Sequence, residues 1–306
     1  MIDKKKELEN QGNDVKLLTL SSTRESYIEG NIYYIGSFPF NVYPDIRASL
    51  SSHNKLINEI IEWHPDIIHS QCEFSTYIFA KRISKICNCP IVHTYHTMYE
   101  HYVRYVLPIG DWSKIVSPLL RWRLKKSAAI IAPTEKVHEN LLHGKFKNKI
   151  SVIPTGIDLS KYSIKLNDSR KAELLKELNI PENARIFGSV GRLAEEKNYS
   201  EVLAALKSIL NTREDVYLVL TGDGAYRNEL EKEVHDLGLD EHVRFPGMIS
   251  PDKIYEYYQI LEFFVSASVS ETQGLTYIEA LANDLPVIAR RDGAIDGVIF
   301  DDVNGY

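Results

Sequence analysis

The stretch IFGSVGRLAEEKN occupies residues 186–198 and passes from a short apolar run into a polar turn. The run predicts a buried strand, and Gly191 stands where that strand ends. A glycine at this point lets a ligand approach the backbone, and Arg192 and Lys197 carry the charge to neutralise a diphosphate beside the next helix. Taken alone, the stretch is more simply a solvated loop whose two cations pair with the glutamates between them.

Outward from this stretch, short apolar runs alternate with amphipathic stretches of helix length, which is typical of βαβ units and a parallel sheet. Strands are predicted at residues 15–20, 66–70, 91–95, 129–132 and 151–153 in the first half, with helices in the gaps. In the second half they are predicted at residues 186–190, 217–221, 243–245, 263–266 and 287–289, with helices beginning near Tyr199, Ala225, Pro251 and Leu275. The pattern occurs twice, so the sequence predicts an α/β protein of two doubly wound, Rossmann-like domains.

A turn-rich break at residues 154–158 separates the two patterns. We therefore predict a first domain at residues 1–160, a connection at 161–183 with a helix over 170–178, and a second domain at 184–306. The chain opens inside a predicted helix and ends without a closing one. We expect the first strand of one domain and the last helix of the other to be missing.

Composition places the chain among soluble globular proteins, with 44% hydrophobic and 25% charged residues. It has no apolar run long enough to cross a bilayer and no signal peptide, so we expect a cytoplasmic location. The three cysteines, Cys72, Cys87 and Cys89, fit neither a disulfide framework nor a zinc site, and are interpreted as reduced thiols.

Charge is distributed unevenly between the halves. The net charge of −6 divides into +5 for residues 1–150 and −11 for residues 151–306. This asymmetry indicates that only the first half faces an anionic partner. Nucleic acid is excluded as that partner, because no long basic stretch with interleaved aromatics occurs.

A second informative stretch, SETQGLTYIEALA, begins at Ser270 and places two carboxylates eight residues apart across a strand-to-helix turn. Glu271 and Glu279 are both expected at the ligand-binding edge of the sheet, where Glu279 could accept two ribose hydroxyls. Backbone N–H groups open the helix toward an anion at its first residues, Gly274, Leu275 and Thr276. The structural alternative is that neither carboxylate binds a ligand. Glu279 would then be an exposed helix residue, and Glu271 a negative charge that the helix dipole favours near the N-terminus.

A third stretch, TGDG at residues 221–224, predicts another strand-to-helix turn at the same edge. Alone it is weak. It lacks the full Gly-x-Gly-x-x-Gly spacing of a dinucleotide fingerprint, which argues against a dehydrogenase.

Four motifs of the second half occur in the order GRLxxEKN, GDG, FPG and SETQGLxxxEA. Together they resemble the motifs of the retaining family 4 glycosyltransferases of the GT-B fold, in which two Rossmann-like domains face a cleft. Glu271 and Glu279 match the Glu-x7-Glu hallmark of that family. In the first half, HTYHTMY at residues 93–99 resembles the strand end that faces the donor sugar, and His96 aligns with its sugar-contacting histidine. Outside such a family, a lone histidine after a strand is more often a structural hydrogen-bonding group.

Within this family, residues 93–105 are most similar to bacterial diacylglycerol glucosyltransferases of the monoglucosyldiacylglycerol synthase type. A helix predicted over 113–126 supports that assignment, because its cationic and apolar side chains lie next to each other as in an interfacial helix. The cations are Lys114, Arg121 and Lys125, and the apolar residues are Ile115, Leu119 and Trp122. A helix that packs its apolar side on the sheet is the structural alternative, and Trp112 and Trp122 could serve both arrangements.

The resemblance implies transfer of a hexose, in the first instance glucose, from a UDP-sugar to a membrane lipid, diacylglycerol, with retention at the anomeric carbon. It implies that Arg192 and Lys197 stabilise the diphosphate, Glu271 and His96 contact the sugar, and Glu279 binds the ribose. Met248 and Ile249 would hold the uracil through backbone groups. No Asp-x-Asp motif occurs, so we expect no metal and no other cofactor. The enzyme would lie peripherally on the inner face of the cell membrane.

Two other functions remain open from the residues alone. One is a soluble family 4 enzyme that acts on a polysaccharide or a small molecule. The other is an inactive, truncated module that binds a UDP-sugar or a lipid surface. The sequence leaves the hexose, the exact acceptor and the oligomeric state undetermined.

Overall fold

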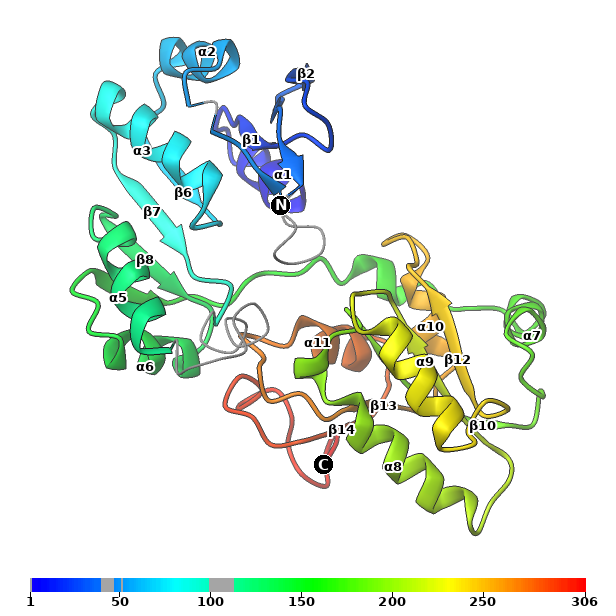
Figure 1. Cartoon of the computed structure of the whole chain (residues 1–306). Helices are drawn as coiled ribbons and strands as arrows, with labels where there is room; N and C mark the ends of the chain where they lie inside the picture. The colour runs from blue at the N-terminus through cyan, green and yellow to red at the C-terminus, as the bar shows by residue number, and fades with distance from the viewer. Residues whose placement is uncertain (1, 40–46, 51, 99–112) are drawn as a thin grey trace. The chain divides into compact units, whose positions relative to one another are not determined.

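A computed structural model describes the chain at residues 2–39, 47–50, 52–98 and 113–306 (Figure 1). The chain divides into two compact units, Met1–Gly156 (unit 1) and Ile157–Tyr306 (unit 2). Each unit contains a parallel sheet covered by helices, so the α/β class predicted from the sequence is confirmed.

Unit 2 is built on a five-stranded parallel sheet in the order β12-β11-β10-β13-β14. Its strands are β10 (Arg185–Val190), β11 (Val216–Thr221), β12 (Val243–Gly247), β13 (Phe263–Ser266) and β14 (Val287–Ala289). All five predicted strands of the second half are therefore present. Because β10 stands between β11 and β13, the strand order reverses beside it, and this switch point is where ligands bind in open α/β sheets.

Helices cover both faces of this sheet. They are α7 (Asp168–Glu177), α8 (Tyr199–Leu210), α9 (Arg227–Asp236), α10 (Ile254–Gln259) and α11 (Leu275–Ala282), with 3-10 turns η1 (Ser160–Ser163) and η2 (Glu195–Lys197). Leu203 and Leu218 belong to the core under α8 and α9, whereas Tyr258, Phe264 and Tyr277 belong to the core under α10 and α11. Burial on both faces explains why these strands are continuous apolar runs rather than alternating ones.

Unit 1 contains a four-stranded parallel sheet in the order β6-β7-β8-β9. Its strands are β6 (Ile68–Ser70), β7 (Ile91–Thr94), β8 (Ala129–Ala132) and β9 (Lys149–Val152). Its described helices are α1 (Ile2–Asn10), α2 (Lys55–Trp63), α3 (Ser75–Cys87), α5 (Ser113–Leu124) and α6 (Glu135–His143). Every predicted strand of the first half is found within two residues of its expected start.

The prediction that helices fill all the gaps of the first half is wrong between residues 20 and 50. A separate sheet, β1-β3-β2, and a short pair, β4-β5, occupy this segment. Their strands are β1 (Leu17–Leu20), β2 (Tyr27–Glu29), β3 (Ile32–Ile35), β4 (Phe38–Pro39) and β5 (Arg47–Ala48). Gly30 has a φ of +56° and turns β2 back onto β3, so the short Tyr- and Ile-rich runs on either side pair as a hairpin.

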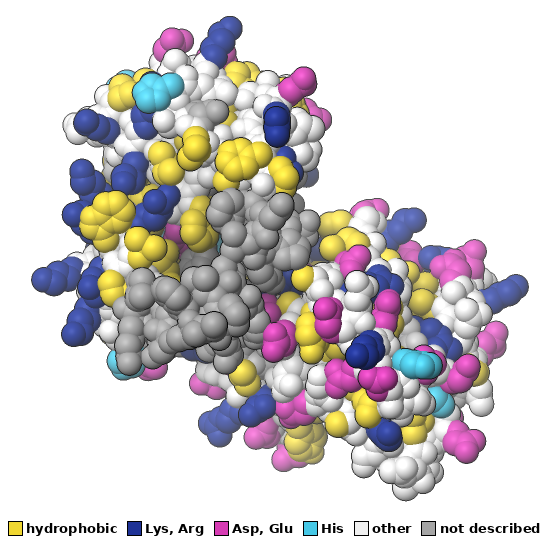
Figure 2. Space-filling model, viewed as in Figure 1, with side chains coloured by type: hydrophobic (Ala, Val, Ile, Leu, Met, Phe, Trp, Pro, Cys, Tyr) yellow, Lys and Arg dark blue, Asp and Glu magenta, His cyan; other side chains and the backbone are white. Residues whose placement is uncertain are grey.

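The cysteines and the distribution of charge agree with the sequence analysis. All three cysteines are free, with Cys87 and Cys89 buried and Cys72 half-buried. In Figure 2, acidic side chains crowd the visible face of unit 2, whereas lysine and arginine predominate among the charged side chains of unit 1. Among the described helices, none is long and apolar enough to cross a membrane.

The ends of β10 and β11 meet so closely that one position admits only glycine. Gly222 has a φ of +136°, and a Cβ built on it would lie 1.8 Å from the carbonyl oxygen of Gly191. Gly238 also has a positive φ, +70°, but a Cβ there would meet nothing within 4 Å. Comparing substitutions at the two glycines therefore separates the cost of a strained backbone conformation from the cost of a collision with the backbone.

We expect Gly222→Ala to lower the free energy of unfolding by about 3 kcal/mol or more, because a left-handed alanine costs roughly 1 kcal/mol and the collision adds to it. Gly238→Ala should lower it by only about 1 kcal/mol. Urea unfolding of both variants measures the difference. Equal losses would show that the strand ends separate freely enough to accept a side chain.

Candidate functional site

The loops that follow β10, β11 and β13 form the candidate site at the carboxyl edge of the sheet in unit 2. β10 pairs with β11 on one side and with β13 on the other, so the three predicted stretches are brought to neighbouring strand ends. The backbone joins two of them directly: Gly191 N donates to Thr221 O at 2.9 Å, and Leu193 N donates to Asp223 O at 3.0 Å. Stretches 30 residues apart in the chain thus share one rigid edge.

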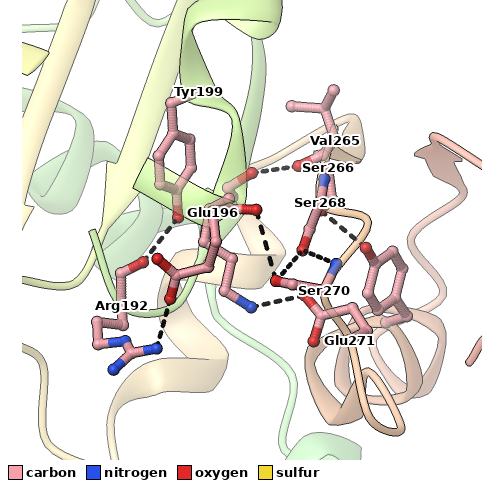
Figure 3. A network of polar contacts seen from close by, with 11 residues as sticks. Arg192, Glu196, Tyr199, Val265, Ser266, Ser268, Ser270 and Glu271 are labelled. Atoms are coloured by element: carbon pink, nitrogen blue, oxygen red, sulfur yellow. Dashed lines mark hydrogen bonds and ion pairs between the residues drawn. The ribbon is translucent and has the colours of Figure 1, made fainter. Parts of the chain in front are cut away.

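An ion pair connects the loop after β10 to the loop after β13. Lys197 Nζ lies 2.6 Å from Glu271 Oε1, and the two side chains are only 22% and 13% exposed. Figure 3 shows Glu271 among the polar contacts around this loop. Limited access to water strengthens the attraction between these charges. The structure therefore places a predicted cation and a predicted carboxylate in contact.

Arg192 has a different partner. Its guanidinium lies 2.6 Å from Glu196 Oε1, and the glutamate side chain is 3% exposed while the arginine is 40% exposed (Figure 3). This contact agrees with the structural alternative for the stretch taken alone, in which cations pair with neighbouring glutamates. The arginine side chain is nevertheless partly accessible at the edge of the site.

A network of hydroxyl groups supports the two loops (Figure 3). Ser189 Oγ donates to the carbonyl of Val265, and Ser270 Oγ donates to the carbonyl of Glu196 at 3.5 Å. Tyr277 OH donates to Ser266 Oγ at 2.8 Å from the facing helix α11. These hydrogen bonds cross the switch point and hold in place the loops that carry Lys197 and Glu271.

Glu279 lies about one turn inside α11 and is held by a buried tyrosine. Tyr258 OH donates to Glu279 Oε2 at 2.8 Å from α10. Burial, together with the charge of Glu279, raises the pKa of Tyr258 well above its usual value and also raises the pKa of Tyr162. Glu279 is half-buried, so it is not the freely exposed helix residue of the structural alternative.

The remaining predicted residues of unit 2 also stand at this edge. Gly274 begins α11 with a φ of +66° and provides no side-chain cap for the N–H groups of Leu275 and Thr276. Met248 and Ile249 follow β12, and Met248 is 75% exposed. These backbone donors and acceptors are therefore placed where a ligand at the strand ends could meet them.

In unit 1, His96 stands two residues beyond β7, beside β6. His96 Nε2 donates to Gln71 Oε1 at 3.3 Å, and burial lowers the pKa of His96, which keeps its imidazole neutral at pH 7. Burial, followed by the charge of Lys4, lowers the pKa of His69 to about 4. Both histidines thus act as neutral hydrogen-bonding groups near neutral pH.

A buried carboxylate beside these histidines was missed from the sequence. Glu73 follows β6 and accepts a hydrogen bond of 3.0 Å from His93 Nε2, and both side chains are almost fully buried. The available signal was its position: Glu73 and His96 follow neighbouring parallel strands, whose carboxyl ends share one edge. Arg123 of α5 donates to the carbonyls of Glu73 and Phe74 and fixes this loop.

Helix α5, predicted over residues 113–126, has both buried and exposed apolar side chains. Leu120 and Leu124 are buried in the core of unit 1, while Leu119 and Trp122 are 56% and 57% exposed. Residues 99–112, which include Trp112 and most of the stretch that resembles the diacylglycerol glucosyltransferases, lie outside the described residues. The side chains of Lys114 and Ile115 also lie outside the description.

Among the described residues, no cluster of three or more His, Cys, Asp or Glu side chains is arranged to hold a metal ion.

Comparison with known protein families matches both units. Residues 2–161 match the family described as Glycosyltransferase Family 4, and residues 170–306 match Glycosyl transferases group 1. The chain is 36% identical over 304 residues to the alpha-monoglucosyldiacylglycerol synthase of Streptococcus pneumoniae, covering 98% of this chain and 69% of that protein. It is 29% identical over 247 residues to the protein of the same name from Acholeplasma laidlawii, covering 78% and 62%.

A third relative, the sulfoquinovosyl transferase SQD2 of Arabidopsis thaliana, is 27% identical over 304 residues, covering 97% of this chain and 57% of that protein. The chain therefore spans between 57% and 69% of the length of these three relatives. Two of the three are named for the synthesis of a glucosyldiacylglycerol, and the third is named for the transfer of a sulfoquinovosyl group.

Solved structures show the same fold. Anabaena Alr3699/HepE in complex with UDP-glucose has a TM-score of 0.69 at 20% identity, covering 84% of this chain and 69% of that one. The sucrose-phosphate synthase of Thermosynechococcus elongatus has a TM-score of 0.72 at 22% identity, covering 97% and 76%. At these identities the likeness concerns the arrangement of the chain, and it agrees with the predicted pair of Rossmann-like domains.

We expect Tyr258→Phe to lower the free energy of unfolding of unit 2 by about 1–3 kcal/mol, because it removes the hydrogen bond to a half-buried carboxylate. Tyr255→Phe on the same helix is the matched control, since no hydrogen bond of its hydroxyl is described, and should change the value by less than about 0.5 kcal/mol. Denaturant unfolding measures both. Similar values for the two variants would mean that the Glu279 contact contributes nothing.

Proposed function

The chain belongs to glycosyltransferase family 4, and from this we propose that it transfers a hexose, glucose in the first instance, from a UDP-sugar to diacylglycerol in a membrane. The named relatives support the lipid acceptor, because two of them are alpha-monoglucosyldiacylglycerol synthases and the first is 36% identical over 98% of this chain. The observation that carries the proposal is the contact between Lys197 and Glu271 at the switch point of unit 2.

The donor would bind across the strand ends of unit 2. Lys197 and Arg192 are the cations for its diphosphate, assisted by the backbone N–H groups at the start of α11, while Gly191 lets the diphosphate approach the backbone. The Glu279 carboxylate, oriented by Tyr258, would accept hydrogen bonds from the ribose hydroxyls. Backbone groups of Met248 and Ile249, which follow β12, would meet the uracil.

Chemistry at the sugar depends on where negative charge grows. When the bond between the anomeric carbon and the diphosphate breaks, the electron pair stays on UDP, and a cation already in place lowers the cost of that charge. Lys197 is held by Glu271 before the donor arrives, so little reorganisation is needed. Glu271 would at the same time bind sugar hydroxyls near the reacting carbon, and the neutral His96 would bind a hydroxyl farther from it.

Transfer with retention, without a metal ion, is part of the proposal. Retention is supported by the Glu-x7-Glu spacing of Glu271 and Glu279, and metal independence by the two cations, Lys197 and Arg192, near the same strand ends. Protein ammonium and guanidinium groups can neutralise a diphosphate directly.

The acceptor would reach the enzyme from a membrane surface. Leu119 and Trp122 are exposed on α5, and the first half of the chain carries a net charge of +5. Exposed apolar side chains next to cations favour the interface of an anionic bilayer. We propose that the protein lies peripherally on the inner, cytoplasmic face of the cell membrane.

The direct test is to incubate the protein with radiolabelled UDP-glucose and vesicles that contain diacylglycerol, and to measure the label in the lipid phase. Label in a glucolipid supports the proposal. Label transferred only to added oligosaccharides or small alcohols would point to a family 4 enzyme with a water-soluble acceptor. Donor binding without transfer to any acceptor would identify a binding module.

We expect Lys197→Ala and Glu271→Ala each to lower the rate of transfer by about 10²–10³-fold or more, the effect of removing one preorganised charge-stabilising contact. Circular dichroism should show an intact fold. Arg185→Ala is the control, because it breaks an exposed ion pair with Glu262 in the same unit and should leave transfer unchanged. Unchanged transfer in either site variant would refute the site.

We also expect transfer to be insensitive to chelators. Protein stripped of divalent ions should retain its full rate in EDTA, because Lys197 and Arg192 supply the charge for the diphosphate. Measuring kcat with and without added Mn²⁺ or Mg²⁺ checks this. Loss of turnover in EDTA, restored by Mn²⁺, would contradict metal independence.

A further inference from the structure

Glu196 is a buried carboxylate in the loop that carries both cations of the candidate site. It belongs to η2, whose last residue is Lys197. Its side chain is 3% exposed, whereas the neighbouring Glu195 is exposed to solvent. A buried charge is costly unless a partner replaces the water that it has lost. Glu196 therefore depends on a partner in a way that Glu195 does not.

The partner of Glu196 is Arg192, four residues earlier in the chain. Arg192 Nη2 donates to Glu196 Oε1 at 2.6 Å, and Figure 3 shows the guanidinium turned toward this carboxylate. Such a charge-assisted hydrogen bond is about twice as strong as a neutral one. Because the arginine side chain is 40% exposed, the pair joins a buried negative charge to a positive charge at the surface of the site.

The main chain on both sides of this pair is held by other contacts. Tyr199 OH donates to the carbonyl of Arg192 at 3.4 Å, and Ser270 Oγ donates to the carbonyl of Glu196 at 3.5 Å. Leu193 and Tyr199 are also buried in the core under α8. The backbone is thus held without the ion pair, so the Glu196 carboxylate acts on the arginine side chain.

Glu196 differs in access from the other carboxylate of the site. Glu271 pairs with Lys197 from the loop after β13 and is 13% exposed, so a donor at the strand ends could also contact it. Glu196 is almost fully covered, and its ion-pair partner among the described residues is Arg192. Any effect of Glu196 on the geometry of a bound donor must therefore pass through Arg192.

A carboxylate at this place opposes the binding of a diphosphate. The positive charges of Arg192 and Lys197 are cancelled by Glu196 and Glu271, so these four side chains carry no net charge. The negative charge of Glu196 also repels the phosphates that the guanidinium would bind. A neutral residue at position 196 would favour tighter binding of the donor. The carboxylate therefore has a role other than affinity.

We propose that Glu196 is a positioning residue that holds the Arg192 guanidinium where negative charge grows on the departing UDP, and that it weakens the binding of UDP at the same time. A cation fixed in advance stabilises the transition state without reorganisation, whereas tight binding of the ground state does not raise kcat. Weaker binding of UDP also favours its release after transfer. This inference rests on the proposed function for the identity of the donor, and it concerns a residue that the donor does not touch.

The experiment measures two quantities in Glu196→Gln: the affinity for UDP, by titration calorimetry without an acceptor, and kcat with UDP-glucose. Glutamine keeps the size of the side chain and one hydrogen-bond acceptor but removes the charge. We expect UDP to bind about three- to tenfold more tightly, because a repelling charge is gone. We expect kcat to fall by about ten- to a hundredfold, because the guanidinium is held less firmly.

Glu195→Gln is the matched control, because it removes the neighbouring exposed charge from the same 3-10 turn. Both quantities should stay within about twofold of the wild type, since solvent screens that charge. Glu196→Asp keeps the charge on a shorter side chain, so kcat should fall while the affinity for UDP stays as in the wild type. The aspartate variant also tests the proposal if Glu196→Gln folds poorly, which thermal unfolding shows.

A double-mutant cycle with Arg192→Gln tests whether Glu196 acts through the arginine. In the Arg192→Gln background, Glu196→Gln should change kcat by less than about twofold, because the group that Glu196 positions is gone. An equal loss of kcat with and without Arg192 would overturn the proposal.

Weaker binding of UDP together with a lower kcat in Glu196→Gln would mean that the residue only stabilises the loop, and would overturn the proposal. An unchanged kcat would overturn it as well. The proposed function is tested on the wild type, by transfer of glucose to lipid. The inference is tested by differences between variants, with kcat measured on whichever acceptor the wild type uses, so failure of one is distinguishable from failure of the other.

Discussion

The ion pair between Lys197 and Glu271 is the contact on which the candidate site depends. The parallel sheet brings the loops after β10 and β13 to one edge, but strand order alone does not fix the side chains in them. The pair restrains them, because separating two mostly buried opposite charges 2.6 Å apart is costly. The hydroxyl contacts of Ser189, Ser270 and Tyr277 then hold the backbone around it. A preorganised charge at the switch point is the result.

Lysine and arginine side chains have different surroundings in the two units. In unit 2, which belongs to the acidic half, Lys197 and Arg192 each have a carboxylate partner. Those partners keep isolated cations in place inside a surface that otherwise repels anions. In unit 1, Lys145, Lys147 and Lys149 line a surface hollow beside α5, no ion pair is described for them, and this half of the chain has a net positive charge. The first arrangement suits one small anion held in a fixed orientation.

Hydrophobic periodicity and the residues at strand ends predicted much of the sheet and of the candidate site from the sequence. The strands of unit 2 are continuous apolar runs bounded by turn residues, and all of them were found, as were Lys197 and Glu271 at their ends. Their contact depends on strand order, which local pattern does not contain. The hairpin at Gly30 was missed because its strands are only three and four residues long. The lysines at 145–149 look like an ordinary polar loop, and only packing of that loop beside α5 shows that they share a hollow.

Tyr162 anchors the short segment that follows the unit boundary. It is fully buried in the core of unit 2, five residues beyond Ile157, and its ring meets Tyr258 edge to face with centroids 6.2 Å apart. Tyr258 in turn holds Glu279. The first buried side chain of unit 2 therefore packs on the same tyrosine that orients the carboxylate proposed for the ribose. Tyr162 and Glu279 thus contact opposite ends of one tyrosine, so a substitution that shifts Tyr162 would also disturb the orientation of the carboxylate.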